Sequence, residues 1–176
     1  SGMAATFLLA QGLSVGDSLN EPEKVAFARE IIQRAKNNAV KLLLPLDVVI
    51  AQKLEANTEY RTVSIDNIPD NWSIMDIGQE SILTYSSHLQ DANTIVWNGP
   101  MGIFETPPFD IGTRSIAEII SLLDQAVTVV GGGSTAEAVD QMGLASKMTH
   151  VSTGGGASLE FLEGKVLPGV AALMDK

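Results

Sequence analysis

The chain has 176 residues, which is enough for a single domain with a core of useful size. Its 21 Asp and Glu residues against 11 Lys and Arg give a formal net charge of −10, and a surface of that sign repels nucleic acids and anionic membranes. Without cysteine there is no disulfide, no thiol catalyst and no cysteine zinc site. Because no apolar run reaches the ~18 residues of a membrane span and no signal peptide is visible, we expect a cytoplasmic protein.

The first half of the chain predicts two helices and several short strands. Residues 3–11 form a helical stretch that Gly12 stops, and they read as the second half of a strand–glycine–helix unit. We therefore expect a chain that is truncated at its N-terminus. Asn20 is the expected N-cap of the second helix, with an apolar stripe from Val25 to Ala35. Strands are predicted at 41–44, 47–51 and 62–65, and a loop at 66–78.

The second half alternates strands and helices more regularly. Helices are predicted over 80–89, near 116–123 and over 158–162, and strands over 94–97, 127–130 and 148–152. Such alternation predicts an α/β fold with a parallel sheet, a Rossmann-like three-layer α/β/α domain that takes up the whole of 1–176. In such sheets ligands bind beyond the carboxyl ends of the strands.

Three glycine-rich turns follow strands in this pattern, at 98–102, 131–133 and 154–156. A strand that turns through glycines into a helix leaves backbone N–H groups and the positive end of the helix dipole at one point, which favours phosphate. A single glycine run is equally well explained by a tight turn, but three at one sheet edge favour a binding site. Ser134 and Glu137 have the spacing of a capping box. Since the chain is acidic, either backbone amides bind the phosphates, or magnesium or residues outside the chain supply positive charge.

Other catalytic patterns are weak. Residues 131–136 match the dinucleotide fingerprint, but the next strand ends in Ser152-Thr153 without the acid that would bind a ribose, and the Walker pattern is absent. His88 and His150 are isolated, and no metal-ligand spacing occurs. Glu160 and Glu163 fit a solvated helix face better than a pair of catalytic acids.

The sequences in and around these turns closely resemble those of the C-terminal, nucleotide-binding domain of the phosphoglycerate kinase family. Residues 96–105 (VWNGPMGIFE) and 152–160 (STGGGASLE) are similar to two long signatures of that family, and shorter pieces match at 2–4, 44–47 and 68–70. The resemblance runs from Gly2 to the C-terminus.

The resemblance implies reversible phosphoryl transfer between 1,3-bisphosphoglycerate and ADP, with Mg²⁺-bound ADP or ATP as the nucleotide and 3-phosphoglycerate held by a separate N-terminal domain. It implies that Glu105 binds the ribose hydroxyls and that Asn98 approaches the nucleotide phosphates. The implied walls of the adenosine pocket are Gly2, Leu19, Met75, Pro100 and Ile103. The implied phosphate contacts are Gly131, Gly132, Gly133, Ser134 and Thr135. Gly154, Gly155 and Gly156 would offer amides to the phosphoryl group in transit. Phosphoryl transfer suits such a site because it needs positioning and charge neutralisation rather than a covalent catalyst.

Three departures from the family pattern matter. Ser134 stands where the family has an Asp that ligates the magnesium of the nucleotide, so no metal ligand is assigned here. Ile74 stands where the family often has Gly, which would narrow the adenine pocket. The chain also lacks the N-terminal domain and the G-A-K loop, whose lysine contacts the transferring phosphate. We therefore expect the chain alone to be inactive and the full-length kinase to be a monomer. The alternatives are a non-catalytic adenine-nucleotide module and, less favoured, a dinucleotide oxidoreductase domain.

Overall fold

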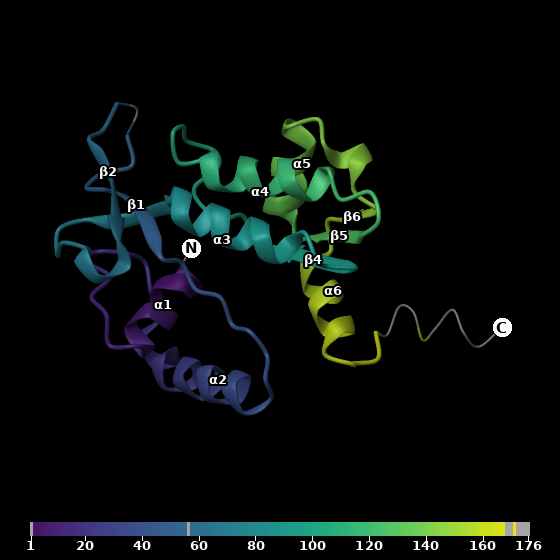
Figure 1. The fold of residues 1–176 in the computed structure, drawn as a ribbon, viewed down its shortest axis with the longest axis horizontal. Helices are drawn as coiled ribbons and strands as arrows, with labels where there is room; N and C mark the ends of the chain where they lie inside the picture. Colours follow the sequence, from purple (N-terminus) through teal and green to yellow (C-terminus); the bar gives the residue numbers. More distant parts are fainter. Residues whose placement is uncertain (1, 56, 168–170, 172–176) are drawn as a thin grey trace. The chain divides into compact units, whose positions relative to one another are not determined.

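A computed structural model describes residues 2–55, 57–167 and 171, which form two compact units (Figure 1). The first unit contains the residues up to 88 together with 101–116. The second contains 89–100 together with the residues from 117 onward. Each unit has its own three-stranded sheet. The sequence-based assignment of one nucleotide-binding domain to 1–176 stays a prediction.

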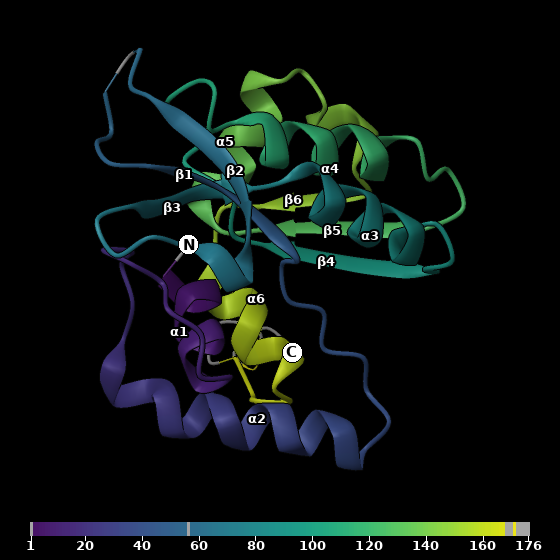
Figure 2. The same ribbon diagram turned by 60° about the vertical axis from the view of Figure 1, so that its left-hand side comes forward.

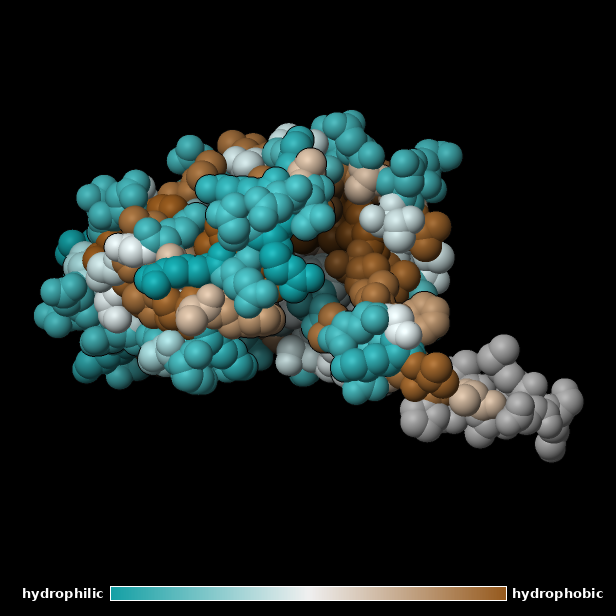
Figure 3. All heavy atoms as spheres, turned by 90° about the horizontal axis from the view of Figure 1, so that it is seen from below, coloured by the Kyte–Doolittle hydropathy of each residue, from teal (hydrophilic) through white to brown (hydrophobic). Residues whose placement is uncertain are grey.

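The helices of the first unit confirm the two helices expected near its start. Helix α1 (Gly2–Ala10) packs against α2 (Val25–Asn37), which follows a 3₁₀ turn, η1 (Pro22–Lys24). Figure 3 shows that the outward face of α2 is hydrophilic, as its charged side chains require. Asn20 is not the N-cap that the sequence predicted, because its amide donates to the Ser18 carbonyl oxygen at 2.8 Å, and Glu21 precedes the turn instead.

The sheet of the first unit is antiparallel, which contradicts the prediction of a parallel sheet throughout. It contains β1 (Asp47–Ala51), β2 (Tyr60–Ser64) and β3 (Ser73–Ile77) in the order β2-β1-β3. The connection between β1 and β2 is shorter than the roughly dozen residues that a parallel crossover needs, so the second strand must turn back. A short 3₁₀ turn, η2 (Ile65–Asn67), follows β2.

Two local predictions in this unit are also wrong. Residues 41–44 do not form a strand, because they are mostly exposed and lie outside both sheets in the described part of the chain. The predicted loop 66–78 instead contains β3, whose Met75 and Ile77 are buried. The core on one side of β1 joins α1 to the sheet; its buried members are Ala5, Leu8, Val15, Val48, Ile50, Ile68 and Trp72.

Helix α3 (Gln79–Leu89) begins at a carboxylate that comes from another element. Asp47 of β1 accepts hydrogen bonds from the backbone N–H groups of Glu80, at 3.1 Å, and Ser81, at 2.8 Å. The Ser81 hydroxyl also donates to Asp47 at 2.7 Å. A Cβ at Gly78 would lie 2.1 Å from an Asp47 oxygen, so only glycine lets the carboxylate come this close. Asp47 therefore satisfies two of the N–H groups that the first turn of α3 leaves free.

The second unit confirms the parallel α/β pattern. Its sheet has the order β4-β5-β6, all parallel (Figure 2). The strands are β4 (Thr94–Asn98), β5 (Val127–Gly131) and β6 (His150–Ser152). The remaining elements are α4 (Ile111–Ser121), which begins in the first unit's residues, α5 (Gly133–Gln141), the 3₁₀ turn η3 (Ala145–Lys147) and α6 (Gly155–Leu162). None of the helices in the described ranges is long and apolar enough to cross a membrane.

Candidate functional site

The three parallel strands of the second unit end level with one another. Asn98 at the end of β4 pairs with Gly131 of β5, and Gly131 pairs with Ser152 of β6. The glycine-rich turns that follow β5 and β6 therefore leave the sheet at the same edge as the turn after β4. This places Asn98 beside the β5 turn, and a Cβ on Gly131 would lie 3.5 Å from the Asn98 amide nitrogen.

Helix α5 starts at a glycine rather than at the predicted capping box. Gly132 is its N-cap with φ 94° and ψ 140°, a backbone conformation that favours glycine, and its carbonyl oxygen accepts from Ala136 N–H at 2.9 Å. Ser134 lies one residue inside the helix, is exposed and makes no cap hydrogen bond. Glu137 accepts from Gln141 instead, at 3.1 Å. The Ser134–Glu137 capping box is thus wrong, because the glycine turn enters the helix two residues earlier.

The N-termini of α5 and α6 meet in this unit. A Cβ on Gly155 would lie 2.6 Å from the Gly132 Cα and 2.9 Å from the Gly132 nitrogen, so the two backbones are in direct contact. In contrast, an added Cβ on Gly133 or Gly156 would meet nothing within 4 Å. The starts of two helices therefore lie together beside open space, and the positive end of each helix favours an anion there.

A buried threonine joins the β4 turn to α5. Thr135 is 1% exposed, and its hydroxyl oxygen accepts from Gly99 N–H at 2.7 Å. The Trp97 indole N–H donates to the Gly99 carbonyl oxygen at 2.8 Å. These bonds fix the segment that carries Asn98 and the half-buried Pro100. Thr135 is consequently a structural anchor, and its buried side chain faces the turn.

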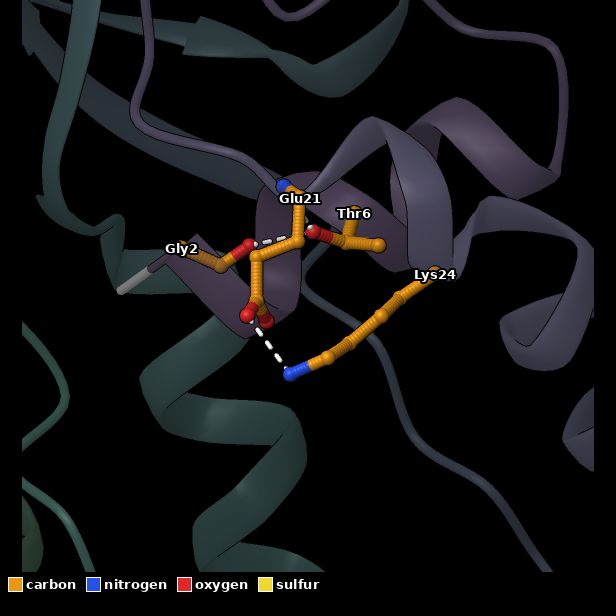
Figure 4. Close-up of polar contacts among 4 residues, drawn as sticks. All are labelled: Gly2, Thr6, Glu21 and Lys24. Carbon is orange, nitrogen blue, oxygen red and sulfur yellow. Dashed lines mark hydrogen bonds and ion pairs between the residues drawn. The ribbon is translucent and has the colours of Figure 1, made fainter.

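In the first unit, Gly2 and Leu19, both assigned to the adenosine pocket, lie next to each other. A Cβ on Gly2 would be 3.3 Å from the Leu19 carbonyl oxygen and 3.4 Å from its Cγ, while the Leu19 side chain is 81% exposed. Figure 4 shows how Thr6 joins the two segments: its hydroxyl donates to the Gly2 carbonyl oxygen at 2.8 Å and accepts from Glu21 N–H at 3.0 Å. The Lys24 ammonium pairs with the Glu21 carboxylate at 2.6 Å on the surface. The sequence pattern did not single out Thr6.

Met75 and Ile103, also assigned to the pocket, are neighbours in the first unit. Ile103 N–H donates to the Met75 carbonyl oxygen at 3.0 Å, and both side chains pack around buried Phe109. Met75 is itself buried, whereas Glu105 is exposed on the same loop as Ile103. Ile74 packs on the opposite face, against the cluster of α1, because successive strand residues face opposite ways.

A buried acid that the sequence analysis missed lies next to this loop. Asp76 in β3 is 1% exposed, and its carboxylate accepts from Ile77 N–H at 2.8 Å and from Gly112 N–H at 2.6 Å. Burial raises the pKa of Asp76 to about 6, with nearby Asp110 acting in the same direction and the two backbone hydrogen bonds opposing it. An acid in an apolar strand was the available signal, but 66–78 was predicted to be a loop.

Comparison with known proteins agrees with the resemblance. The family profile described as "Phosphoglycerate kinase" matches residues 1–165. Phosphoglycerate kinases of Chloroflexus aurantiacus and Pelotomaculum thermopropionicum are 54% and 58% identical over 176 and 175 residues, which is 99% of this chain and 44% of each relative. A chloroplastic phosphoglycerate kinase of Volvox carteri is 55% identical over 177 residues, 99% of this chain and 38% of its own length.

Solved structures show the same likeness. The phosphoglycerate kinase of Coxiella burnetii has a TM-score of 0.91 at 43% identity, over 94% of this chain and 43% of that chain. The phosphoglycerate kinase of Pyrococcus horikoshii has a TM-score of 0.80 at 31% identity, over 97% of this chain and 43% of that chain. The chain thus spans less than half the length of the relatives it matches.

Proposed function

Because this chain belongs to the phosphoglycerate kinase family, we propose that it is the nucleotide-binding, C-terminal domain of such a kinase. The complete protein would transfer a phosphoryl group reversibly from the acyl phosphate of 1,3-bisphosphoglycerate to ADP, giving 3-phosphoglycerate and ATP. Its parallel sheet would belong to a Rossmann-like three-layer domain, and the N-terminal domain would hold 3-phosphoglycerate. We place the protein in the cytoplasm as a monomer, although one relative is chloroplastic.

The observation that carries this proposal is the contact between Gly132 and Gly155, which brings two helix N-termini to one open region. The backbone amides there suit the phosphates of ADP without any lysine or arginine, which fits the acidic composition. The amides of 131–135 would bind the phosphates of the nucleotide, and those of 154–156 would bind the phosphoryl group in transit. Such fixed donors lower the barrier because phosphoryl transfer mainly spreads charge over oxygens.

In the first unit, the exposed Leu19 beside Gly2 would cover the adenine, and Ile103, backed by Met75, would line the same pocket. The exposed Glu105 carboxylate would accept hydrogen bonds from the ribose hydroxyls. Magnesium, when bound with the nucleotide, neutralises phosphate charge. Ser134 presents one exposed hydroxyl at the start of α5, a poorer magnesium ligand than a carboxylate.

Calorimetric titration with ADP tests the proposal. The chain should bind ADP with an affinity that depends only weakly on magnesium, because amides and helix dipoles attract the phosphates with or without the metal. Ser134→Asp should increase that dependence, since the new carboxylate repels free ADP and attracts Mg-ADP. Ser134 makes no cap hydrogen bond, and acids are favoured in the first turn, so α5 should persist in the variant.

Ser134→Asn is the matched control, because it has the size of Asp without its charge and should keep the weak dependence. Absence of ADP binding in every buffer would refute a nucleotide site in this chain. Equal magnesium dependence in the natural chain and in Ser134→Asp would show that another group ligates the metal.

A further inference from the structure

Residues 102–112, the loop that leads into α4 together with the first two residues of that helix, carry Ile103 and Glu105, and both ends of this segment, called loop 102–112 below, touch one carboxylate. The Asp76 oxygen accepts from Gly112 N–H at 2.6 Å. At the other end, a Cβ on Gly102 would lie 2.3 Å from an Asp76 oxygen, and a Cβ on Gly112 would lie equally close. The loop therefore closes around the carboxylate, and glycine at each end makes this approach possible.

Other contacts fasten the same loop to β3 and to the start of α4. Ile103 N–H donates to the Met75 carbonyl oxygen, adjacent to Asp76, at 3.0 Å. The buried Thr113 hydroxyl oxygen accepts from Met101 N–H at 3.0 Å and from Gly102 N–H at 3.3 Å. The beginning of the loop is thus held twice by its neighbours, whereas Asp76 is the group that bonds to its end at Gly112.

Burying the Asp76 carboxylate costs free energy of folding, so stability alone does not explain this residue. No ion pair to Asp76 occurs within the described residues, and its acidic neighbour Asp110 pairs with Arg114 at 2.8 Å. A buried carboxylate without a cationic partner costs free energy even when backbone N–H groups satisfy its oxygens. The raised pKa of Asp76, about 6, reflects that cost. Such a group is explained more readily by what it holds in place than by the stability it adds.

We propose that Asp76 is a positioning residue for nucleotide binding, whose carboxylate fixes loop 102–112 so that Glu105 meets the ribose hydroxyls. The inference rests on the proposed function, because Glu105 has a ribose to meet only if the chain binds a nucleotide. Asp76 itself does not touch the nucleotide. Its effect reaches the ribose through the loop and leaves the glycine turns of the second unit unchanged.

The test compares ADP with 2′,3′-dideoxy-ADP in calorimetric titrations of the 176-residue chain. Asp76→Asn keeps the side-chain shape but replaces one acceptor oxygen with an NH₂ donor, so one of the two backbone N–H groups loses its acceptor. We expect this variant to weaken ADP about tenfold, the size of one lost hydrogen bond to a charged group. Dideoxy-ADP should bind the natural chain and the variant with equal affinity, because it lacks the ribose hydroxyls that would donate hydrogen bonds to Glu105.

Two further variants sharpen the result. Glu105→Gln should show the same selective loss, and the double variant should lose little more than either single variant, since both act on one interaction. Asp110→Asn is the matched control, a nearby acid of the same loop that pairs with Arg114 instead of bridging the loop ends. Equal weakening of ADP and dideoxy-ADP by Asp76→Asn would overturn the inference, and so would an unchanged affinity for ADP.

Hydrogen exchange without nucleotide separates this inference from the proposed function. Asp76→Asn should accelerate exchange of the amides of 102–112 about tenfold more than that of the β1 amides. Gly112→Ala, whose Cβ would lie 2.3 Å from an Asp76 oxygen, should do the same and replaces the Asn variant if that one does not fold. If the natural chain does not bind ADP, the proposed function fails, and unchanged exchange in the loop would then refute the positioning role independently.

Discussion

Lowering the pH should stabilise the chain through Asp76, against the usual effect of acid on proteins. The pKa of this carboxyl rises from its ordinary value of 3.8 to about 6 in the folded chain, chiefly because of burial. The folded state therefore holds the proton more tightly than the unfolded state. Below about pH 3 both states are protonated, and above about pH 7 both are ionised. In between, the contribution of Asp76 to stability falls as the pH rises, by about 3 kcal/mol in total.

Urea denaturation of the natural chain and of Asp76→Asn between pH 3.5 and 8 measures this effect. The other carboxyl groups titrate in both proteins, so their effects largely cancel in the difference between the two free energies of unfolding. That difference should shift toward the Asn variant by about 2 kcal/mol between pH 4 and pH 6, by about 3 kcal/mol between pH 3.5 and pH 7, and stay level above pH 7. A difference that is constant with pH, or that moves toward the natural chain as pH rises, would refute the assignment of an unpaired buried carboxylate.

Three further predictions concern other contacts. Thr135→Val should lower the free energy of unfolding by about 1–3 kcal/mol, because Gly99 N–H loses its acceptor, while Thr135→Ser should retain most of the stability. Equal urea midpoints for Thr135→Val and the natural chain would contradict the structural role of Thr135. Thr6→Val should lower the free energy of unfolding by about 1 kcal/mol, because the hydroxyl that links Gly2 to Glu21 is lost, and Thr6→Ser should restore it. A Val variant with unchanged stability would show that these two hydrogen bonds contribute nothing. Within the described residues no strand pairs with the outer edge of β4, where Val96 is 39% exposed, so sedimentation experiments should show self-association that increases with protein concentration. Val96→Lys should reduce the self-association more than Val96→Thr, and a monomer at all concentrations would contradict the prediction.

The glycine turns and the parallel strands of the second unit could be predicted because their causes are local. Runs such as 127–130 show the β-branched pattern of a buried strand, and glycines follow at the strand ends. The helix start at Gly133 was harder to locate. Ser134 and Glu137 have the right spacing for a cap, yet Gly132 is already the N-cap and its carbonyl oxygen accepts the first helical hydrogen bond, so the spacing alone was misleading.

The first unit was predicted less well because its decisive contacts are distant in sequence. The carboxylate of Asp76 meets Gly112, and the Thr6 hydroxyl meets Glu21, and neither pair leaves a periodic mark in the sequence. Strand β3 was hidden for a related reason. Turn-forming residues precede it, and Asp76 interrupts its apolar pattern, so propensity favoured a loop where pairing with β1 decides the structure.

The carboxylate of Asp47 at the start of α3 links the folding of two elements. The first N–H groups of the helix donate to a carboxylate on a strand more than thirty positions earlier, so the hydrogen bonds of its first turn form only after β1 has packed against it. A peptide of residues 79–89 alone lacks that acceptor, and a helix of this length is marginal in water. Strand and helix should accordingly form and melt as one cooperative unit, with the amides of Glu80 and Ser81 exchanging hydrogen only when β1 also opens.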